Sequence, residues 1–134
     1  MKEQQLYFEQ KLRYEMDSWD LDDAMSRGEK ILPVDTRSAE SFDYEHIPGA
    51  VNIPHRTMSP GTTSHLDKEI LYVTYCNGIG CNASTKGALK LLNLGFKVKE
   101  LTGGLDWWKR DGHPTEGRRV KSSSSDGIEW SYVG

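Results

Sequence analysis

The chain lacks long apolar runs, carries few cysteines and has no excess of positive charge. No apolar stretch approaches the roughly 20 residues that a membrane-spanning helix needs. The formal net charge is -3, which gives no electrostatic argument for binding nucleic acid. The first residues lead into charged side chains rather than into the apolar segment of a signal peptide. We therefore expect a cytoplasmic protein that binds neither membranes nor nucleic acids.

Cysteine and metal-ligand patterns are equally sparse. The only cysteines are Cys76 and Cys81, too few for a disulfide framework, and in a reducing cytosol we expect thiols unless they are catalytic. The four histidines show no metal-ligand spacing with one another or with the cysteines. We expect no metal and no cofactor. The sequence does not indicate an oligomeric state.

Within these limits, 134 residues are enough for one domain with a proper core. Apolar segments that read as strands alternate with segments that read as helices, which predicts an α/β fold: a parallel sheet with helices on both faces. The expected strands are 12–16, 31–35, 51–53, 70–75 and 97–101. The expected helices are 6–12, 18–27, 38–44, 83–94 and 104–111. Residues 59–64 are rich in Gly, Pro, Ser and Thr and are expected as loop.

The two ends of the chain differ from its centre. Residues 1–17 are expected to form a helix and a strand that extend a domain spanning 18–114. Residues 115–134 are expected to form a flexible tail, because a basic stretch precedes a run of serines. The alternation of Ile128, Trp130 and Tyr132 leaves two possibilities open, an added edge strand or a disordered end.

The most informative stretch surrounds Cys76. It follows the expected strand 70–75 and precedes the expected helix 83–94, so Cys76 lies where open α/β sheets place their ligands. Gly78 and Gly80 are expected to let the backbone curl, so that loop N–H groups form an anion-binding nest and lower the thiol pKa. The alternative is a buried structural cysteine. The loop residues are Asn77, Gly78, Ile79, Gly80, Cys81 and Asn82.

Two blocks of sequence, in order and at family spacing, resemble rhodanese-like domains. The first block is Val34-Asp35-Thr36-Arg37, Phe42 and His46-Ile47-Pro48-Gly49-Ala50-Val51-Asn52-Ile53-Pro54. The second is Tyr75-Cys76 with its loop and helix, Leu94-Gly95-Phe96, and Leu101-Thr102-Gly103-Gly104 with Trp108. The resemblance implies a five-stranded parallel α/β domain, a Cys76 that carries sulfane sulfur as a persulfide, and no cofactor. The partners it implies are a small sulfur donor or a protein persulfide or thiol acceptor. Asp35, Arg37 and His46 are interpreted as structural support, with His46 as a further partner of the Asp35–Arg37 pair.

The loop departs from familiar rhodaneses because its six residues after Cys76 are all uncharged, whereas many rhodaneses carry a basic residue there. Thiosulfate is a dianion, so we expect weak activity with it. Three functions remain open: a sulfurtransferase using Cys76, which we favour, a thiol redox protein using Cys76 and Cys81, and a non-catalytic binding or sulfur-carrier module. For Cys81 we favour inert packing over a second sulfur acceptor or a resolving thiol, because N–H groups rather than side chains are expected to line the nest. That interpretation predicts no Cys76–Cys81 disulfide.

Overall fold

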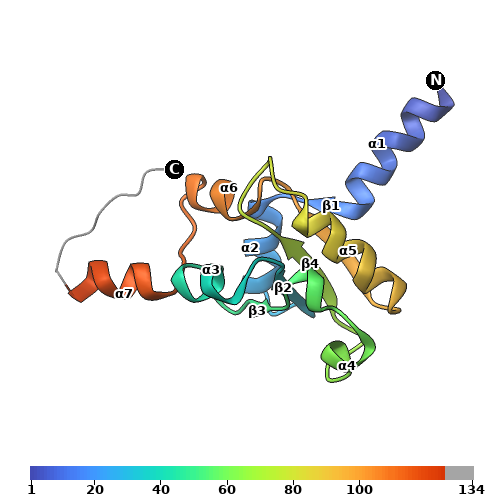
Figure 1. The fold of residues 1–134 in the computed structure, drawn as a ribbon. Coiled ribbons are helices and arrows are strands. Elements are labelled where there is room, and N and C mark those ends of the chain that lie inside the picture. Colours follow the sequence, from blue (N-terminus) through green and yellow to red (C-terminus); the bar gives the residue numbers. More distant parts are fainter. Residues whose placement is uncertain (126–134) are drawn as a thin grey trace.

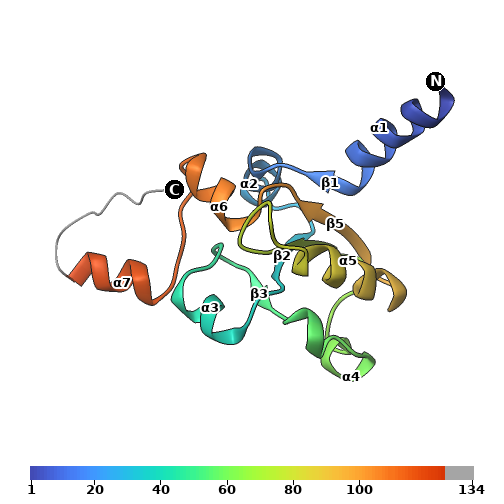
Figure 2. The ribbon, with the colours of Figure 1, turned by 45° about the horizontal axis from the view of Figure 1, so that its top comes forward.

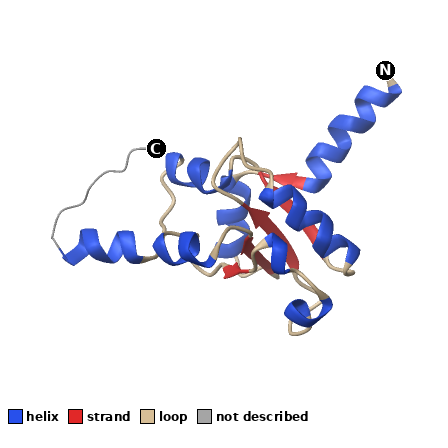
Figure 3. Ribbon diagram, viewed as in Figure 1, coloured by secondary structure: helices blue, strands red, loops and turns tan. Residues whose placement is uncertain are grey.

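The computed structural model describes residues 1–125, which form a five-stranded sheet with helices around it (Figure 1). The strands are β1 (Glu15–Met16), β2 (Ile31–Asp35), β3 (Val51–Asn52), β4 (Leu71–Tyr75) and β5 (Lys97–Leu101). Their order is β1-β5-β4-β2-β3, and every neighbouring pair is parallel. Figure 3 shows the strands in red among the blue helices. The predicted α/β fold and parallel sheet are confirmed, with β4 at the centre.

The helices lie on both faces of this sheet, with α2 and α5 on opposite sides (Figure 2). They are α1 (Lys2–Tyr14), α2 (Ser18–Ser26), α3 (Ala39–Tyr44), α4 (Pro60–Thr63), α5 (Ala83–Asn93), α6 (Gly104–Arg110) and α7 (Arg118–Ser125), with a 3-10 turn at His55–Thr57. Within residues 1–125, none of these helices combines the length and the apolar character that crossing a membrane requires.

Strand β4 is buried on both faces because two apolar clusters meet it from opposite sides. Val73 and Tyr75 point into the cluster shared with α2 and α6. Tyr72 points into the cluster shared with α5. Alternate residues of a strand face opposite sides, and a central parallel strand covered on both faces is a nearly continuous apolar run, interrupted here by the buried Thr74. This arrangement holds the carboxyl end of β4, and Cys76 after it, in a rigid setting.

The N-terminal segment differs from the expectation in one respect. The helix continues to Tyr14, and only Glu15 and Met16 are extended, so the strand expected over 12–16 is mostly helical. A sequence rich in Lys, Glu and Gln favours helix, and Lys11 and Glu15 form an i,i+4 ion pair of 3.0 Å. Strand β1 nevertheless pairs with β5, so it belongs to the sheet. Helix α1 projects away from the body (Figure 1).

Two segments expected as irregular form helical turns. Ser59 and Thr62 make a reciprocal capping box, which stabilises the single turn of α4. Beyond residue 114, the backbones of Glu116 and His46 bond to each other in both directions, at 2.8 and 2.9 Å, and α7 follows. The folded part of the chain thus extends past 114. The possible edge strand with Ile128, Trp130 and Tyr132 lies outside the described residues.

Candidate functional site

Cys76 follows the last residue of β4 and is 2% exposed. The first turn of α6 holds the backbone here: the Leu105 N–H donates to the Cys76 carbonyl at 2.9 Å, and the Asp106 N–H donates to the Asn77 carbonyl at 2.7 Å. N–H groups in the first turn of a helix have no acceptor within that helix, so the two loop carbonyls serve as acceptors for the Leu105 and Asp106 N–H groups. Two elements distant in sequence therefore fix where the cysteine loop begins.

This close approach requires glycine at position 104. Its φ is +60°, and a Cβ there would lie 2.5 Å from the Cys76 carbonyl oxygen. Neither Gly78 nor Gly80, in contrast, has a positive φ, so the loop does not use the left-handed conformation at these two positions. A Cβ on Gly78 would lie 3.2 Å from the Asp106 Cβ, and one on Gly80 would meet open space. The positive φ is used instead at Gly104, the first residue of α6, which the sequence analysis quoted in the family motif but did not assign to the site.

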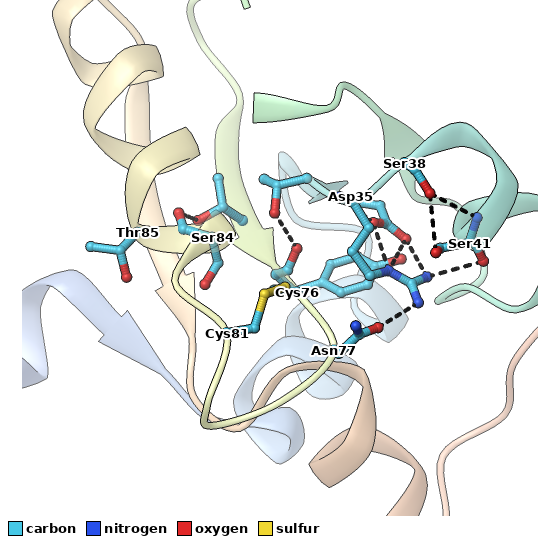
Figure 4. The surroundings of a disulfide bond; sticks show 12 residues. Asp35, Ser38, Ser41, Cys76, Asn77, Cys81, Ser84 and Thr85 are labelled. Atoms are coloured by element: carbon cyan, nitrogen blue, oxygen red, sulfur yellow. Dashed lines mark hydrogen bonds and ion pairs between the residues drawn. A yellow bond between two sulfur atoms is a disulfide. The ribbon is translucent and has the colours of Figure 1, made fainter. Parts of the chain in front are cut away.

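Cys76 and Cys81 form a disulfide, with their Cα atoms 6.2 Å apart (Figure 4). The prediction that Cys81 packs without bonding is therefore wrong. The Cys81 N–H donates to the Gly78 carbonyl at 3.1 Å, which closes a tight turn and returns the chain toward Cys76. The prediction assumed that later side chains of a curled loop point away from its centre, whereas this turn directs the Cys81 side chain toward Cys76. A Cα separation below about 7 Å is compatible with a disulfide.

A cavity of about 290 Å³ opens beside the two cysteines, at the carboxyl edge of the sheet. It lies between the cysteine loop, the start of α5, the end of β5 and strand β1. Its walls are Glu15, Cys76, Gly78, Ile79, Gly80, Cys81, Asn82, Ser84, Thr85 and the run 100–104. Asn77 is the one loop residue of the predicted set that is not among these residues.

The charged side chains in this wall are two carboxylates, and no lysine or arginine lines the cavity among the described residues. Glu100 accepts hydrogen bonds from the hydroxyls of Ser84 and Thr85, each at 2.7 Å. Glu15 is paired across the strands with Glu100 and is balanced by its ion pair with Lys11. Sequence reasoning missed both carboxylates. The available signal was the position of Glu100 near the carboxyl end of an expected strand, but the neighbour of that strand was unknown.

A buried ion pair supports the loop from the other side. Arg37 is 8% exposed and Asp35 is fully buried, with 2.7 Å between the Arg37 Nη2 and the Asp35 Oδ2 atoms. The same guanidinium donates to the Glu45 carbonyl at 2.6 Å and to the Asn77 Oδ1 atom at 2.9 Å. Burial lowers the pKa of Arg37, but hydrogen bonds and the charge of Asp35 outweigh it, so the pKa is raised overall. The pair orients Asn77 away from the cavity (Figure 4).

His46 takes a different place from the one expected. Its ring stacks on Phe42 with centroids 3.8 Å apart, its Nδ1 atom lies 2.7 Å from the Phe42 carbonyl oxygen, and its Nε2 atom lies 3.5 Å from the Glu116 carboxylate. It therefore joins α3 to the segment before α7. The partner of the Asp35–Arg37 pair on this side is instead the backbone of Glu45.

The described residues contain no group of three or more His, Cys, Asp or Glu side chains placed to hold a metal ion. What the site offers is a cysteine pair and a polar cavity. Of the loop N–H groups expected to form a nest, that of Cys81 is bonded to the Gly78 carbonyl. Such an arrangement suits thiol chemistry, in which a thiolate attacks sulfur and is regenerated by another thiol.

A parallel α/β domain with a cysteine loop after its central strand is the class that the fold and the site define. The sequence profile of the rhodanese-like domain matches residues 19–111. The chain belongs to the rhodanese-like domain family. The BH2092 protein from Bacillus halodurans has a similar solved structure, with a TM-score of 0.84 and 41% sequence identity, over 88% of this chain and 87% of that one.

Curated relatives carry different functions. Thiosulfate sulfurtransferase 16, chloroplastic, from Arabidopsis thaliana is 30% identical over 104 residues, which cover 70% of this chain and 85% of that protein. The HTH-type transcriptional regulator Rv0324 from Mycobacterium tuberculosis is also 30% identical over 104 residues, covering 71% of this chain but only 45% of the regulator. The chain thus spans less than half of that regulator's length. Sulfurtransferases are among its relatives, and the domain also occurs within proteins of other named functions.

Proposed function

We propose that this domain is a sulfurtransferase that carries sulfane sulfur on Cys76. The observation that carries the proposal is the position of Cys76, at the end of the central strand and in the wall of an open polar cavity. A carrier cysteine needs a fixed sulfur and room for a donor beside it. The sequence similarity to a thiosulfate sulfurtransferase supports the same proposal.

The loading step needs the reduced protein. The Cys76 thiolate attacks the outer sulfur of the donor, and the donor's bond to that sulfur breaks with its electron pair on the leaving group, which is sulfite when the donor is thiosulfate. The product is a Cys76 persulfide. A nucleophilic acceptor, a small molecule or the thiol of a protein, then takes the outer sulfur and restores the thiolate. No cofactor takes part in either step.

The cavity argues for weak activity with thiosulfate. Glu100 lines it and no basic side chain of the described residues does, so a dianion approaches against a like charge. The absence of positive charge in the loop already predicted weak activity with thiosulfate, and Glu100 adds a group that repels the dianion. A donor of lower negative charge, such as a thiosulfonate monoanion or an uncharged persulfide, fits the cavity better.

The decisive experiment is sulfur loading of fully reduced protein, followed by intact mass measurement and cyanolysis. The Cys81→Ser variant should gain one sulfur atom on Cys76, and the Cys76→Ser variant should gain none. A Cys81→Ser protein that folds, has a free Cys76 thiol and takes up no sulfur from any of these donors would refute the sulfurtransferase and favour a non-catalytic module.

A thiol redox function is a second candidate, and the disulfide is the observation that favours it. In this case Cys76 is oxidised first and Cys81 closes the bond. The disulfide should then form after mild peroxide treatment in the absence of any sulfane donor, and a dithiol should reverse it. Absence of that disulfide after peroxide treatment would remove the second candidate without affecting the first.

A further inference from the structure

The disulfide places two sulfurs of one cavity within bonding reach. Cys76 and Cys81 are separated by five positions, both line the cavity, and Cys81 is held by the turn to the Gly78 carbonyl. Since the bond joins the two Sγ atoms, the sulfur that Cys81 can reach is the Sγ of Cys76 itself. In a loaded protein that atom is the inner sulfur of the persulfide.

We infer that Cys81 is a resolving thiol that discharges the Cys76 persulfide as hydrogen sulfide. This inference rests on the proposed loading of Cys76. It gives the domain a second activity: release of sulfide from a sulfane donor at the expense of a dithiol reductant, without transfer of the sulfur to an acceptor.

The step balances within the protein. The Cys81 thiolate attacks the inner sulfur of the persulfide, and the bond between the inner and outer sulfurs breaks. Its electron pair leaves with the outer sulfur, which takes up the proton that the Cys81 thiol gave up on ionising, departs as hydrosulfide and equilibrates with hydrogen sulfide in water. The sulfane sulfur is thus reduced by two electrons, and the two cysteines are oxidised to the disulfide. A dithiol reductant then exchanges with that disulfide and returns both thiols.

The alternative attack, on the outer sulfur, would move the sulfane sulfur to Cys81 and leave no disulfide. The geometry favours the inner sulfur because the two Sγ atoms are in direct contact across a Cα separation of 6.2 Å. The cavity wall also favours departure of the product, since Glu100 repels an anion and no basic side chain among the described residues lines the wall to retain it. The structure, with its Cys76–Cys81 disulfide, therefore corresponds to the protein after release of sulfide.

The test is a single turnover without reductant. Fully reduced protein, freed of reductant, is mixed with one equivalent of benzenethiosulfonate anion, whose by-product is a sulfinate rather than sulfide. Sulfide, free thiols and intact mass are followed together. Wild type should release one sulfide for each disulfide formed and keep no added sulfur. The Cys81→Ser variant should keep the sulfur on Cys76 and release sulfide more slowly by at least roughly tenfold, because it lacks the intramolecular thiol.

The Cys76→Ser variant is the control for direct attack of Cys81 on the donor, and it should release no sulfide. A wild type that keeps its persulfide as long as Cys81→Ser does, or that carries the sulfur on Cys81, would overturn the inference and leave the sulfurtransferase intact. If Cys81→Ser does not load at all, the proposed function fails and the inference fails with it. A disulfide that resists a dithiol in the native protein would be structural, which also overturns the inference. Wild type alone decides the case if a variant does not fold, through the ratio of sulfide to disulfide.

Discussion

Replacing Gly104 with alanine tests the contact that fixes the cysteine loop. The substitution places a Cβ at φ +60° and 2.5 Å from the Cys76 carbonyl oxygen. A left-handed conformation costs a non-glycine residue about 1–2 kcal/mol. Forcing an extra carbon into a packed contact costs about 1–3 kcal/mol more. We therefore expect Gly104→Ala to reduce the free energy of unfolding by about 2–5 kcal/mol.

Gly28 provides a matched control. Its φ is +74°, and a Cβ there would meet nothing within 4 Å, so Gly28→Ala carries only the conformational cost of about 1–2 kcal/mol. The difference between the variants isolates the contact with the loop. In thermal melts it should appear as a further ~3–15 °C loss of Tm in Gly104→Ala.

A second readout follows the loop itself. In reduced protein, the rate of Cys76 alkylation should change in Gly104→Ala and stay at the wild-type value in Gly28→Ala, because only the first change displaces the Cys76 carbonyl. Equal melting temperatures and equal alkylation rates in the two variants would refute the argument that α6 holds the loop through this contact.

Three further predictions follow. Glu100→Gln should raise kcat/KM for thiosulfate roughly two- to tenfold at low ionic strength and less at high salt. Glu69→Gln, at the opposite end of β4, is the control and should leave kcat/KM unchanged. A gain that is the same at low and high salt would show that the effect is not electrostatic. Arg37→Ala should destabilise the protein by about 3–5 kcal/mol in urea unfolding, because it leaves the buried Asp35 unpaired; loss of sulfur loading in a stable variant would instead assign Arg37 to the chemistry. Burial and nearby cations lower the pKa of His55 below its ordinary 6.5, so the unfolded state binds more protons and stability falls as pH falls from about 6.5. His55→Gln should flatten that slope in melts across this range, and an unchanged slope would assign it to another group.

The central part of the fold could be predicted because its signals are local. An apolar run, a glycine-bearing loop and an amphipathic segment are contiguous in sequence around Cys76, and each specifies its own secondary structure. The pairing of Asp35 with Arg37 could be anticipated for the same reason, since the two residues are neighbours on one strand end. The extent of α1 could not, because alternation over a few residues is also compatible with a charged helix.

The direction of the Cys81 side chain could not be predicted because it depends on contacts between distant segments. The loop path is set by two N–H groups of α6 and by the space left at Gly104. The two carboxylates that line the cavity depend on distant contacts in the same way. Glu15 and Glu100 lie opposite each other in the pairing of β1 with β5, although they are 85 positions apart in the sequence. Residue spacing in the sequence therefore predicts neither the direction of the Cys81 side chain nor the proximity of the two carboxylates.

The pairing of β1 with β5 bears on where this chain can be shortened. Strand β1 has two residues, yet it covers one edge of β5 and supplies Glu15 to the cavity. A chain that begins at Ser18 would retain every other strand but leave β5 as a bare edge, with unpaired N–H and C=O groups open to another molecule. Such a chain would lose a wall of its cavity and gain a surface for self-association, so sulfur chemistry measured on it would describe a different protein.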